Sequence, residues 1–334
     1  MTVIRVLAPG PATTVQDLGR PGHAALGVSA CGAADAVALR LGNQLVGNPA
    51  AAAALEMTLL GATLRFESAA WIALTGAPCA ARRGQGAANE SAVPMWTALR
   101  LEAGETLGCR AISAGARTYL CVAGGLAVPR VLGSAATHVR SGLGGQQGRA
   151  LRAGDELEVA PSVTAPRPGT IAPSTVETLY PRHQPRLLRV TPGPQQAQLA
   201  AAFAALLAAE YEVSARSDRM GVRLIGPPLL GSAGPGLPAG GAGDGAAPLG
   251  ELLSQGVFLG AVQLPADGQP ILLSVDQQTT GGYPVLAGVI AADLCRLGQL
   301  RPGDRVRFAA VSLEEADALH AAQRQLVASP GWVL

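Results

Sequence analysis

One short pattern recurs three times along the chain: LEAGETLGC at 101–109, LRAGDELEV at 151–159 and LRPGDRVRF at 300–308. Each copy has a Leu, two variable residues, a Gly, an acid and then alternating apolar positions. Glycine readily adopts turn conformations, and the alternation is typical of a half-buried strand. Such units are common where short strands close into small barrels. Because two copies lie in the first half and one near the end, the pattern predicts two β-barrel-like domains. The alternative is chance recurrence of a common turn.

The composition also favours many short elements. The chain has 334 residues, a length that suggests about two domains. Its 43 glycines and 25 prolines favour turns, and with only 3% aromatic residues the cores must consist of Ala, Val, Leu and Ile. We interpret the high alanine content as a property of the composition rather than as a helix signal. Runs punctuated by Gly or Pro predict strands at 2–8, 62–67, 71–75, 97–101 and 118–123.

Few helices are expected. Asp35 can cap a helix over about 35–46, and a capping box opens another over about 312–327. A third helix is expected over about 285–297, after a Gly-Gly turn. The predicted fold class is therefore mainly β, with a few helices.

Proline and glycine density predicts the domain boundaries. We expect a proline-rich linker where periodicity is weak, and a mobile loop over 227–248, which is dense in Gly, Pro and Ala. The expected organisation is an N-terminal β-barrel-like domain over 1–165, the linker over 166–186, a C-terminal β-barrel-like domain over 187–312 and a C-terminal helix over 313–328.

Several classes of protein are disfavoured by charge and cysteine usage. The net charge is +2 with no concentrated basic run, so nucleic-acid binding is not indicated. The N-terminus lacks the pattern of a signal peptide, and no uncharged apolar run reaches the roughly 20 residues that span a bilayer. Five scattered cysteines, without a CxxC pair or clustered histidines, favour free thiols in a reducing cytosol over a metal site. We therefore expect a cytoplasmic protein without a bound metal.

The segment TTVQDLGR at 13–20 concentrates polar groups. The forked donors of Arg20 suit a planar carboxylate, bicarbonate or phosphate. Asp17 is a candidate catalytic group that orients Arg20 or accepts a proton, and Thr14 and Gln16 are candidate binding residues. The alternative is a structural Asp17–Arg20 pair at the end of a strand.

A second polar segment is DQQTTGGYP at 276–284. Its two glycines let the backbone approach a ligand and direct amide N–H groups at an anion. Asp276 is a candidate base, and Tyr283 offers a phenol and a stacking face. The alternative is a plain Gly-Gly turn. The candidate binding residues here are Gln278, Thr279, Thr280, Gly281 and Gly282.

A third segment, SDRMG at 217–221, supplies Arg219, which is a candidate anion ligand or a partner in a loop salt bridge. We expect the active surface to draw on both halves of the chain. In this expectation Gln16, Asp17 and Arg20 face Asp276, Gln278, Thr279, Thr280 and Tyr283.

Three motifs of other enzyme classes are not supported by the sequence. GLGGQQG at 142–148 lacks the strand before it and the helix after it that a dinucleotide loop needs. No Walker A loop is present, and no serine has the context of a nucleophile elbow.

Taken together, the segments resemble one family in order and spacing. The resemblance covers almost the whole chain, and TTVQDLGR with QTTGGYP is its most specific part. The family is that of the 5-oxoprolinase C subunit, also called the KipA or biotin-dependent carboxyltransferase family and allophanate hydrolase subunit 2. The matching segments are TTVQDLGRPG at 13–22, CGAADAVALRLGNQLVGN at 31–48, LEMTLLGATLRF at 55–66, LTGAPC at 74–79, YLCVAGGLAVPRVLGS at 119–134, GLGGQQGR at 142–149, SDRMGVRLIG at 217–226 and the block 254–308.

The resemblance implies two cyclophilin-like β-barrel domains and a role in a multi-subunit enzyme. The partners would be a KipI-like B subunit together with a LamB/YcsF-like A subunit. The reaction would be ATP-dependent opening of 5-oxo-L-proline to L-glutamate, with ATP shared with one of these partners.

Two other functions stay open within the resemblance. One is the carboxyltransferase component of a biotin-dependent, urea-type carboxylase. Since no Met-Lys-Met acceptor is present, biotin would have to be carried by another protein. The other is a KipA-like adaptor that regulates a histidine kinase through a KipI-like partner.

Overall fold

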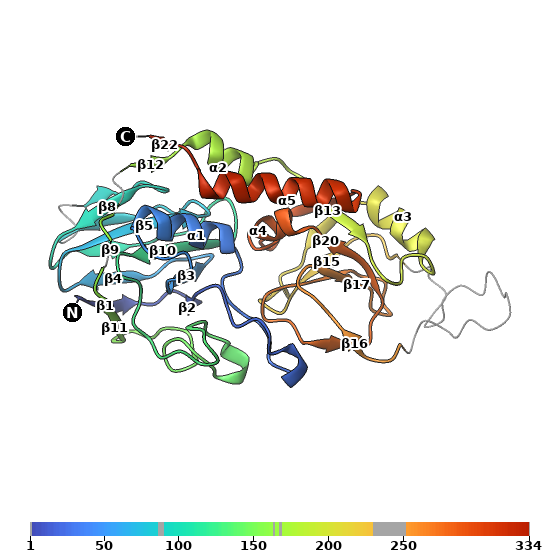
Figure 1. The fold of residues 1–334 in the computed structure, drawn as a ribbon, viewed down its shortest axis with the longest axis horizontal. Coiled ribbons are helices and arrows are strands. Elements are labelled where there is room, and N and C mark those ends of the chain that lie inside the picture. Colours follow the sequence, from blue (N-terminus) through green and yellow to red (C-terminus); the bar gives the residue numbers. More distant parts are fainter. Residues whose placement is uncertain (1, 86–89, 163, 167–168, 230–251, 334) are drawn as a thin grey trace. The chain divides into compact units, whose positions relative to one another are not determined.

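The computed structural model describes residues 2–85, 90–162, 164–166, 169–229 and 252–333. The chain folds into two compact units (Figure 1). Unit 1 comprises Met1–Pro21, Cys31–Pro181 and Arg324–Leu334, and unit 2 comprises Gly22–Ala30 and Arg182–Gln323. Of the loop expected over 227–248, all but 227–229 lies outside the described residues.

Unit 1 is built on two antiparallel sheets. Its strands are β1 (Thr2–Ala8), β2 (Thr13–Gln16), β3 (Ala54–Thr58), β4 (Thr63–Phe66), β5 (Ala70–Gly76), β6 (Arg82–Gly84), β7 (Ser91–Ala92), β8 (Ala98–Leu101), β9 (Thr106–Gly108), β10 (Arg117–Val122) and β11 (Glu156–Val159). One sheet has six strands in the order β11-β1-β4-β9-β6-β7, and the other has five in the order β2-β3-β10-β5-β8. Both sheets contribute side chains to one core. In β3, for example, Leu55 and Met57 lie in that core, because alternate side chains of a strand point to the same face.

Helix α1 (Ala36–Leu45) covers the other face of the five-stranded sheet, against β5 and β10. Asp35 caps this helix as expected, because its carboxylate accepts the N–H of Ala38 at 2.9 Å. A second core forms there, which includes Leu39, Tyr119 and Cys121. Unit 1 also holds the pair β12 (Thr170–Ile171) and β22 (Trp332–Val333), and helix α2 (Pro173–Leu179).

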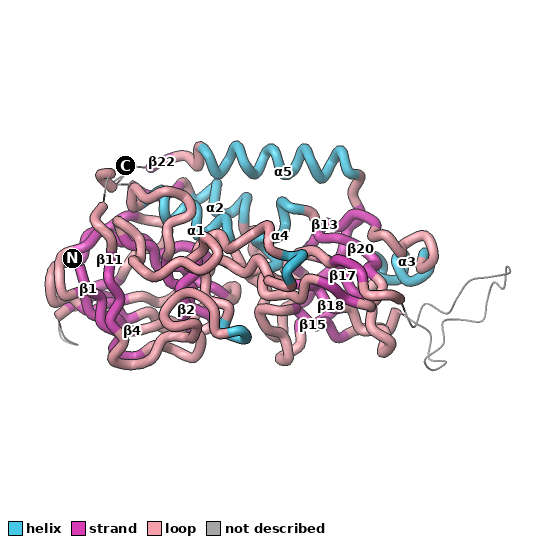
Figure 2. Tube along the Cα trace, turned by 60° about the horizontal axis from the view of Figure 1, so that its bottom comes forward, coloured by secondary structure: helices cyan, strands magenta, loops and turns pink. Residues whose placement is uncertain are grey.

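Unit 2 is a closed barrel of seven strands in the order β13-β20-β17-β18-β15-β14-β21. Figure 2 shows the barrel strands in magenta, with β13, β15, β17, β18 and β20 labelled. The barrel strands are β13 (Arg186–Pro192), β14 (Tyr211–Val213), β15 (Gly221–Ile225), β17 (Ala261–Gln263), β18 (Ile271–Leu273), β20 (Val285–Val289) and β21 (Arg305–Ala310). A separate two-stranded sheet pairs β16 (Gln255–Gly256) with β19 (Thr280–Gly281). The other helices of the described residues, in both units, are α3 (Ala200–Ala208), α4 (Leu294–Leu297), α5 (Leu313–Ala328) and the 3-10 helices η1 (Ala24–Leu26), η3 (Val139–Ser141) and η4 (Ala291–Asp293).

The three repeats fold into the same hydrogen-bonded turn. In each copy the acid donates its backbone N–H to the carbonyl three residues earlier, and its carboxylate accepts the N–H of that residue. The glycine, with φ of 81°, 87° and 87° in the three copies, donates its N–H to a carbonyl in a different strand. The recurrence is therefore structural and not chance. The glycine–acid pairs are Gly104–Glu105, Gly154–Asp155 and Gly303–Asp304.

The mainly β fold class is confirmed, as are the helices expected at 35–46 and 312–327. The helix expected over 285–297 is wrong in its first part. Residues 285–289 form strand β20, and the α-helix there covers only Leu294–Leu297. The run VLAGV is buried at every position, and a short, fully buried run cannot be assigned by periodicity.

Two helices were not expected. The sequence AAAFAALLA of α3 is apolar on all sides, so it offered no amphipathic pattern, and its alanines were interpreted as composition. Helix α2 lies inside the proline-rich stretch 166–186, where Pro173 occupies the first turn, a position that proline tolerates. The domain boundaries expected from sequence stay predictions. Within the described residues, no helix is long and apolar enough to cross a membrane.

Candidate functional site

Asp17 follows directly after the buried strand β2 and is itself buried. Its Oδ1 accepts the backbone N–H of Gly19 at 2.7 Å and the hydroxyl of Ser134 at 2.6 Å. Its Oδ2 accepts the N–H of Ala135 at 2.7 Å. Oδ1 therefore shapes the turn at 17–20, and both carboxylate oxygens hold the segment that begins at Ser134.

Arg20 is 2% exposed and reaches the same segment by different bonds. Its Nε donates to the carbonyl of Val131 at 3.3 Å, and its Nη2 donates to the carbonyl of Ala136. Among the described residues, Nη1 has no acceptor and Arg20 forms no ion pair. Asp17 and Arg20 are therefore not joined directly in the described residues, and each holds the segment 131–136 by its own bonds. A buried cation with an unused donor is a group that an anion would satisfy.

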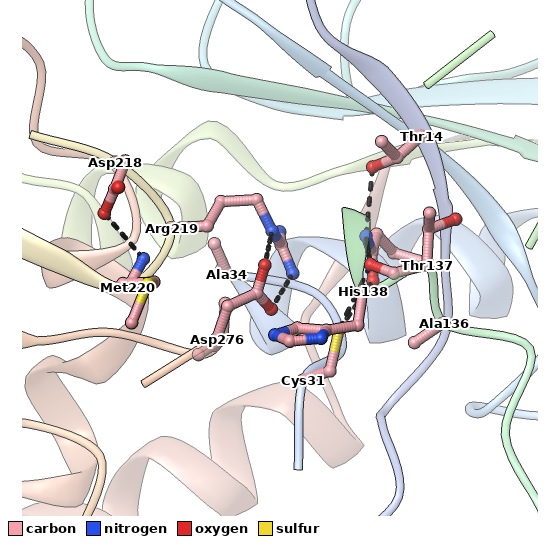
Figure 3. Close-up of polar contacts among 12 residues, drawn as sticks. Thr14, Cys31, Ala34, Ala136, Thr137, His138, Asp218, Arg219, Met220 and Asp276 are labelled. Atoms are coloured by element: carbon pink, nitrogen blue, oxygen red, sulfur yellow. Dashed lines mark hydrogen bonds and ion pairs between the residues drawn. The ribbon is translucent and has the colours of Figure 1, made fainter. Parts of the chain in front are cut away.

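Gln16 and Thr14 share one hydrogen-bond network in unit 1. Nε2 of Gln16 donates to Oγ1 of Thr14 and to the carbonyl of Thr137, both at 3.0 Å. The thiol of Cys31 donates to the same carbonyl at 3.2 Å (Figure 3). Cys31 has a positive φ of 55°, an uncommon conformation for a residue with a side chain. Sequence reasoning missed Cys31, since positive φ is invisible in the letters.

The glycine-rich segment at 142–148 has a packing role in unit 1. A Cβ on Gly144 would lie 2.1 Å from the carbonyl oxygen of Ala136 and 2.9 Å from Nη2 of Arg20. A Cβ on Gly145 would lie 1.9 Å from Oγ1 of Thr137. Only glycine allows this segment to approach the backbone that carries the Arg20 acceptors.

In unit 2, Arg219 and Asp276 form a bidentate ion pair (Figure 3). Nε donates to Oδ2 at 2.8 Å and Nη2 donates to Oδ1 at 2.9 Å, with side chains 16% and 8% exposed. The backbone N–H of Asp276 also donates to the carbonyl of Arg219 at 2.8 Å. Two candidates from separate segments are thus brought together, and the salt-bridge interpretation of Arg219 is confirmed.

The residues after Asp276 form the edge of the small β16–β19 sheet. Gln255 pairs with Gly281 and Gly256 pairs with Thr280. The carbonyl of Thr279 accepts the N–H of Val257 at 3.1 Å. Nε2 of Gln278 donates to Oε1 of Gln263 at 3.3 Å. The side chains of this edge differ in exposure: Thr280 is exposed, Tyr283 is 50% exposed, and Gln278, Thr279, Gly281 and Gly282 are half-buried.

Unit 1 contains a buried charged network that sequence reasoning also missed. Glu56 accepts the hydroxyl of Tyr119 at 2.7 Å and lies 3.5 Å from Nε of Arg117. The oxygen of Tyr119 accepts the N–H of Asp35 at 2.8 Å. Burial, and then the carboxylates of Glu56 and Asp35, raise the pKa of Tyr119 well above its usual range. A charged residue in the apolar run ALEMT was the available signal. The network ties β3 and β10 to the start of α1.

The described residues contain no group of three His, Cys, Asp or Glu side chains arranged to hold a metal ion. The five cysteines are free and buried.

Comparison with known proteins identifies the family. The family described as carboxyltransferase domain, subdomain A and B, matches residues 26–310. The 5-oxoprolinase C subunit of Escherichia coli is 39% identical over 335 residues, which cover 99% of each chain. That of Haemophilus influenzae is 36% identical over 95% of this chain and 94% of its own length.

Solved structures agree with this relationship. The urea amidolyase of Kluyveromyces lactis superposes with a TM-score of 0.85 at 30% identity, over 98% of this chain and 20% of that one. The urea carboxylase of the same organism has a TM-score of 0.85 at 29% identity, and the match covers 98% of this chain and 29% of that one. The chain therefore belongs to the family of the carboxyltransferase domain, subdomain A and B, in which the 5-oxoprolinase C subunits are relatives over its whole length.

Proposed function

We propose that the chain is the C subunit of an ATP-dependent 5-oxoprolinase and helps convert 5-oxo-L-proline to L-glutamate. One observation carries this proposal. The 5-oxoprolinase C subunit of Escherichia coli matches over 99% of both chains, whereas the urea amidolyase of Saccharomyces cerevisiae matches with only 17% of its length. A match that accounts for the whole of both proteins favours the same role in the same kind of assembly.

The second candidate is the carboxyltransferase component of a urea-type, biotin-dependent carboxylase. The TM-score of 0.85 to the urea carboxylase of Kluyveromyces lactis supports it. In that case the biotin would be carried by another protein.

Arg20 is the proposed anion ligand in unit 1. Its Nη1 is buried and has no acceptor among the described residues, so a substrate carboxylate or a phosphate would pair a charge that is otherwise uncompensated there. Thr14 and Gln16 are proposed as binding residues beside it. Asp17 is proposed to support catalysis by holding this segment in place, since both of its oxygens accept bonds from the chain.

The proposed residues in unit 2 act on the reacting amide. A lactam carbonyl is a poor electrophile because its nitrogen donates electrons into it, and coupling to ATP would remove this resistance. Arg219 and Asp276 are proposed to act as a pair, with Asp276 handling a proton and Tyr283 presenting its phenol. The proposed binding groups are Gln278, Thr279, Thr280, Gly281 and Gly282. Whether segments 13–20 and 276–284 serve one substrate stays a prediction.

The proposed partners are a KipI-like B subunit together with a LamB/YcsF-like A subunit. ATP is proposed to be contacted partly by one of them, because the sequence holds no Walker A loop. The proposed location is the cytoplasm, where five free thiols suit a reducing environment.

The test is reconstitution. The chain alone is expected to form negligible glutamate from 5-oxo-L-proline and ATP, and addition of both partners should produce ATP-dependent turnover. Full turnover by the chain alone would contradict the shared site. Biotin-dependent carboxylation of urea by a complex that makes no glutamate would favour the second candidate.

Variants test the proposed residues within that complex. Arg20→Ala and Asp276→Ala should lose turnover while still binding the partners. Arg130→Ala is the matched control, because Arg130 is exposed and its guanidinium donates to the carbonyl of Gly133 in the same region. Equal turnover in Arg20→Ala and Arg130→Ala would remove Arg20 from the site.

A further inference from the structure

Two glutamine amides lie beside Gly281 in unit 2, and two further glutamines are connected to this position by strand pairing and by a hydrogen bond. Nε2 of Gln263 would lie 2.7 Å from a Cβ on Gly281, and Nε2 of Gln278 would lie 3.4 Å from it. Gln255 is the cross-strand partner of Gly281. Side chains of directly opposed residues lie on the same face of an antiparallel pair, so Gln255 shares the face that Gly281 leaves open. The fourth, Gln195, donates to Oε1 of Gln255 at 3.4 Å.

Two of these amides have donors that nothing in the described chain accepts. Nε2 of Gln263 and Nε2 of Gln255 are both buried without a hydrogen-bond partner. Gln263 is only 1% exposed, so its amide is shielded from bulk solvent. Buried donors without acceptors are rare in folded proteins, because each one costs the free energy of its lost hydration. Two such donors close to Gly281, which has no side chain, indicate that a ligand supplies the acceptor.

The chemistry of the missing acceptor follows from the local charges. The donors are neutral amides, and the charges of Arg219 and Asp276 in the same unit neutralise each other in a bidentate pair. A neutral pair of N–H donors suits an uncharged carbonyl oxygen, which has two lone pairs, better than an anion, for which cationic donors are stronger.

We propose that Gln263 and Gln255 bind the carbonyl oxygen of a small uncharged amide group on the Gly281 face of the β16–β19 sheet. This deepens the proposed function and relies on it for the identity of the substrate, whose lactam carbonyl is such a group. A urea carbonyl has the same chemistry. The donors stay in place when the carbonyl becomes more negative during reaction, so they stabilise that charge as well.

Entry of the ligand requires only small side-chain movements. Gln278 donates to the amide of Gln263, Gln255 lies opposite Gly281, and both glutamines are half-buried. Gln278 is held by a bond of 3.3 Å and Gln255 by one of 3.4 Å, which are long for N–H···O bonds. The absence of a side chain at Gly281 leaves the approach open, and Gly281→Ala should block it.

The first experiment is direct binding to the full chain. Side-chain amide NMR signals are assigned by their loss in Gln263→Met and Gln255→Met, and 2-pyrrolidinone, a lactam without a carboxylate, is titrated. The amide protons of both glutamines should move downfield. L-proline, which has a carboxylate and no lactam carbonyl, should leave them unmoved. No shift at saturating 2-pyrrolidinone, or an equal shift with L-proline, would overturn the proposal.

The second experiment separates binding from folding. Gln263→Met removes an unpaired donor and one long bond from Gln278, so the melting temperature should change little. Its affinity for 2-pyrrolidinone should fall about tenfold, the value of roughly one hydrogen bond. The control is Gln269→Met, because the amide of Gln269 both donates to and accepts from the backbone of Gly226. It should lower the melting temperature and keep the affinity. The opposite pattern would make Gln263 structural.

The reconstituted complex distinguishes this proposal from the proposed function. If the complex makes glutamate, Gln263→Met should raise KM or lower kcat for 5-oxo-L-proline and leave inhibition by L-proline unchanged. If the complex makes glutamate and Gln263→Met leaves KM and kcat unchanged, the carbonyl site is overturned while the proposed function stands. A complex that makes no glutamate refutes the proposed function, and the binding of 2-pyrrolidinone by the chain then still decides the carbonyl site.

Discussion

Replacement of Asp17 tests the role that its hydrogen bonds assign to it. Oδ1 accepts two donors, the N–H of Gly19 and the hydroxyl of Ser134, and Oδ2 accepts the N–H of Ala135. In Asp17→Asn, one oxygen becomes an NH₂ group. With this group at the Oδ2 position, the N–H of Ala135 loses its acceptor. With it at the Oδ1 position, the N–H of Gly19 loses its acceptor, although Ser134 can rotate and accept.

In either orientation one backbone N–H, buried at Ala135 or half-buried at Gly19, is left without an acceptor, which costs about 1–3 kcal/mol of the free energy of unfolding. Asp17→Ala strands both backbone N–H groups, while Ser134 again reorients. Its expected cost is roughly twice as large, about 2–6 kcal/mol. The free energy of unfolding should therefore be highest for the natural protein, lower for Asp17→Asn and lowest for Asp17→Ala.

Tryptophan fluorescence measures this in unit 1 alone, because Trp71, Trp96 and Trp332 are the only tryptophans of the chain and all belong to that unit. Urea unfolding followed by this signal gives a midpoint and slope for each variant. Glu177→Gln is the matched control, since it makes the same change of charge at an exposed position of unit 1 and should stay within about 0.5 kcal/mol. Equal midpoints for Asp17→Asn and Asp17→Ala, or values near the control for both, would refute the assigned bonds.

Three further outcomes are expected. In the reconstituted complex, Arg20→Ala should lose several hundredfold or more in turnover, because an anion left unpaired in a buried site costs roughly 3–5 kcal/mol, and steady-state kinetics that stay within tenfold would contradict this. The hydrogen-bonded guanidinium of Arg149 lowers the pKa of Asp155, so this carboxylate stabilises unit 1 at neutral pH and the contribution is lost as the pH falls through the lowered folded value. Asp155→Asn should therefore unfold more easily at neutral pH and lose less stability than the natural protein when the pH is lowered, as tryptophan fluorescence would record. If the stability of the two proteins fell in parallel with pH, the pair would contribute nothing. Gly124→Ala should destabilise unit 1 strongly, because the new Cβ would lie 1.8 Å from the carbonyl oxygen of Ala160, whereas the new Cβ of Gly104→Ala has no atom within 4 Å and costs only the strain of its positive φ, about 1 kcal/mol; similar unfolding midpoints for the two would count against the close approach.

Local patterns in the sequence were sufficient for much of the fold. The glycine–acid repeats, strand alternation and the Asp35 cap are each decided within about ten residues, because they depend on φ preferences, side-chain periodicity and short-range hydrogen bonds. The structure contains all three repeats as the same turn and has strands at each of the five runs expected.

Local pattern failed where burial on all sides erased periodicity. The run at 285–289 became strand β20 only because β13 and β17 lie on either side of it and pair with its backbone. The same letters without those neighbours are compatible with the helix that was expected.

The sequence by itself determined which residue types were available for chemistry: an arginine and a carboxylate after β2, and hydroxyls, amides and two glycines after Asp276. Only the tertiary structure decided which of their atoms are already used. Arg20 and Asp17 are three residues apart, yet their partners at Val131 to Ala136 are more than a hundred residues away. Gln263 became notable only when Gly281 was placed against its unpaired amide. Local conformation is governed by neighbours in the chain, whereas hydrogen-bond satisfaction depends on every group that folding brings into contact, and that sum cannot be read from a segment.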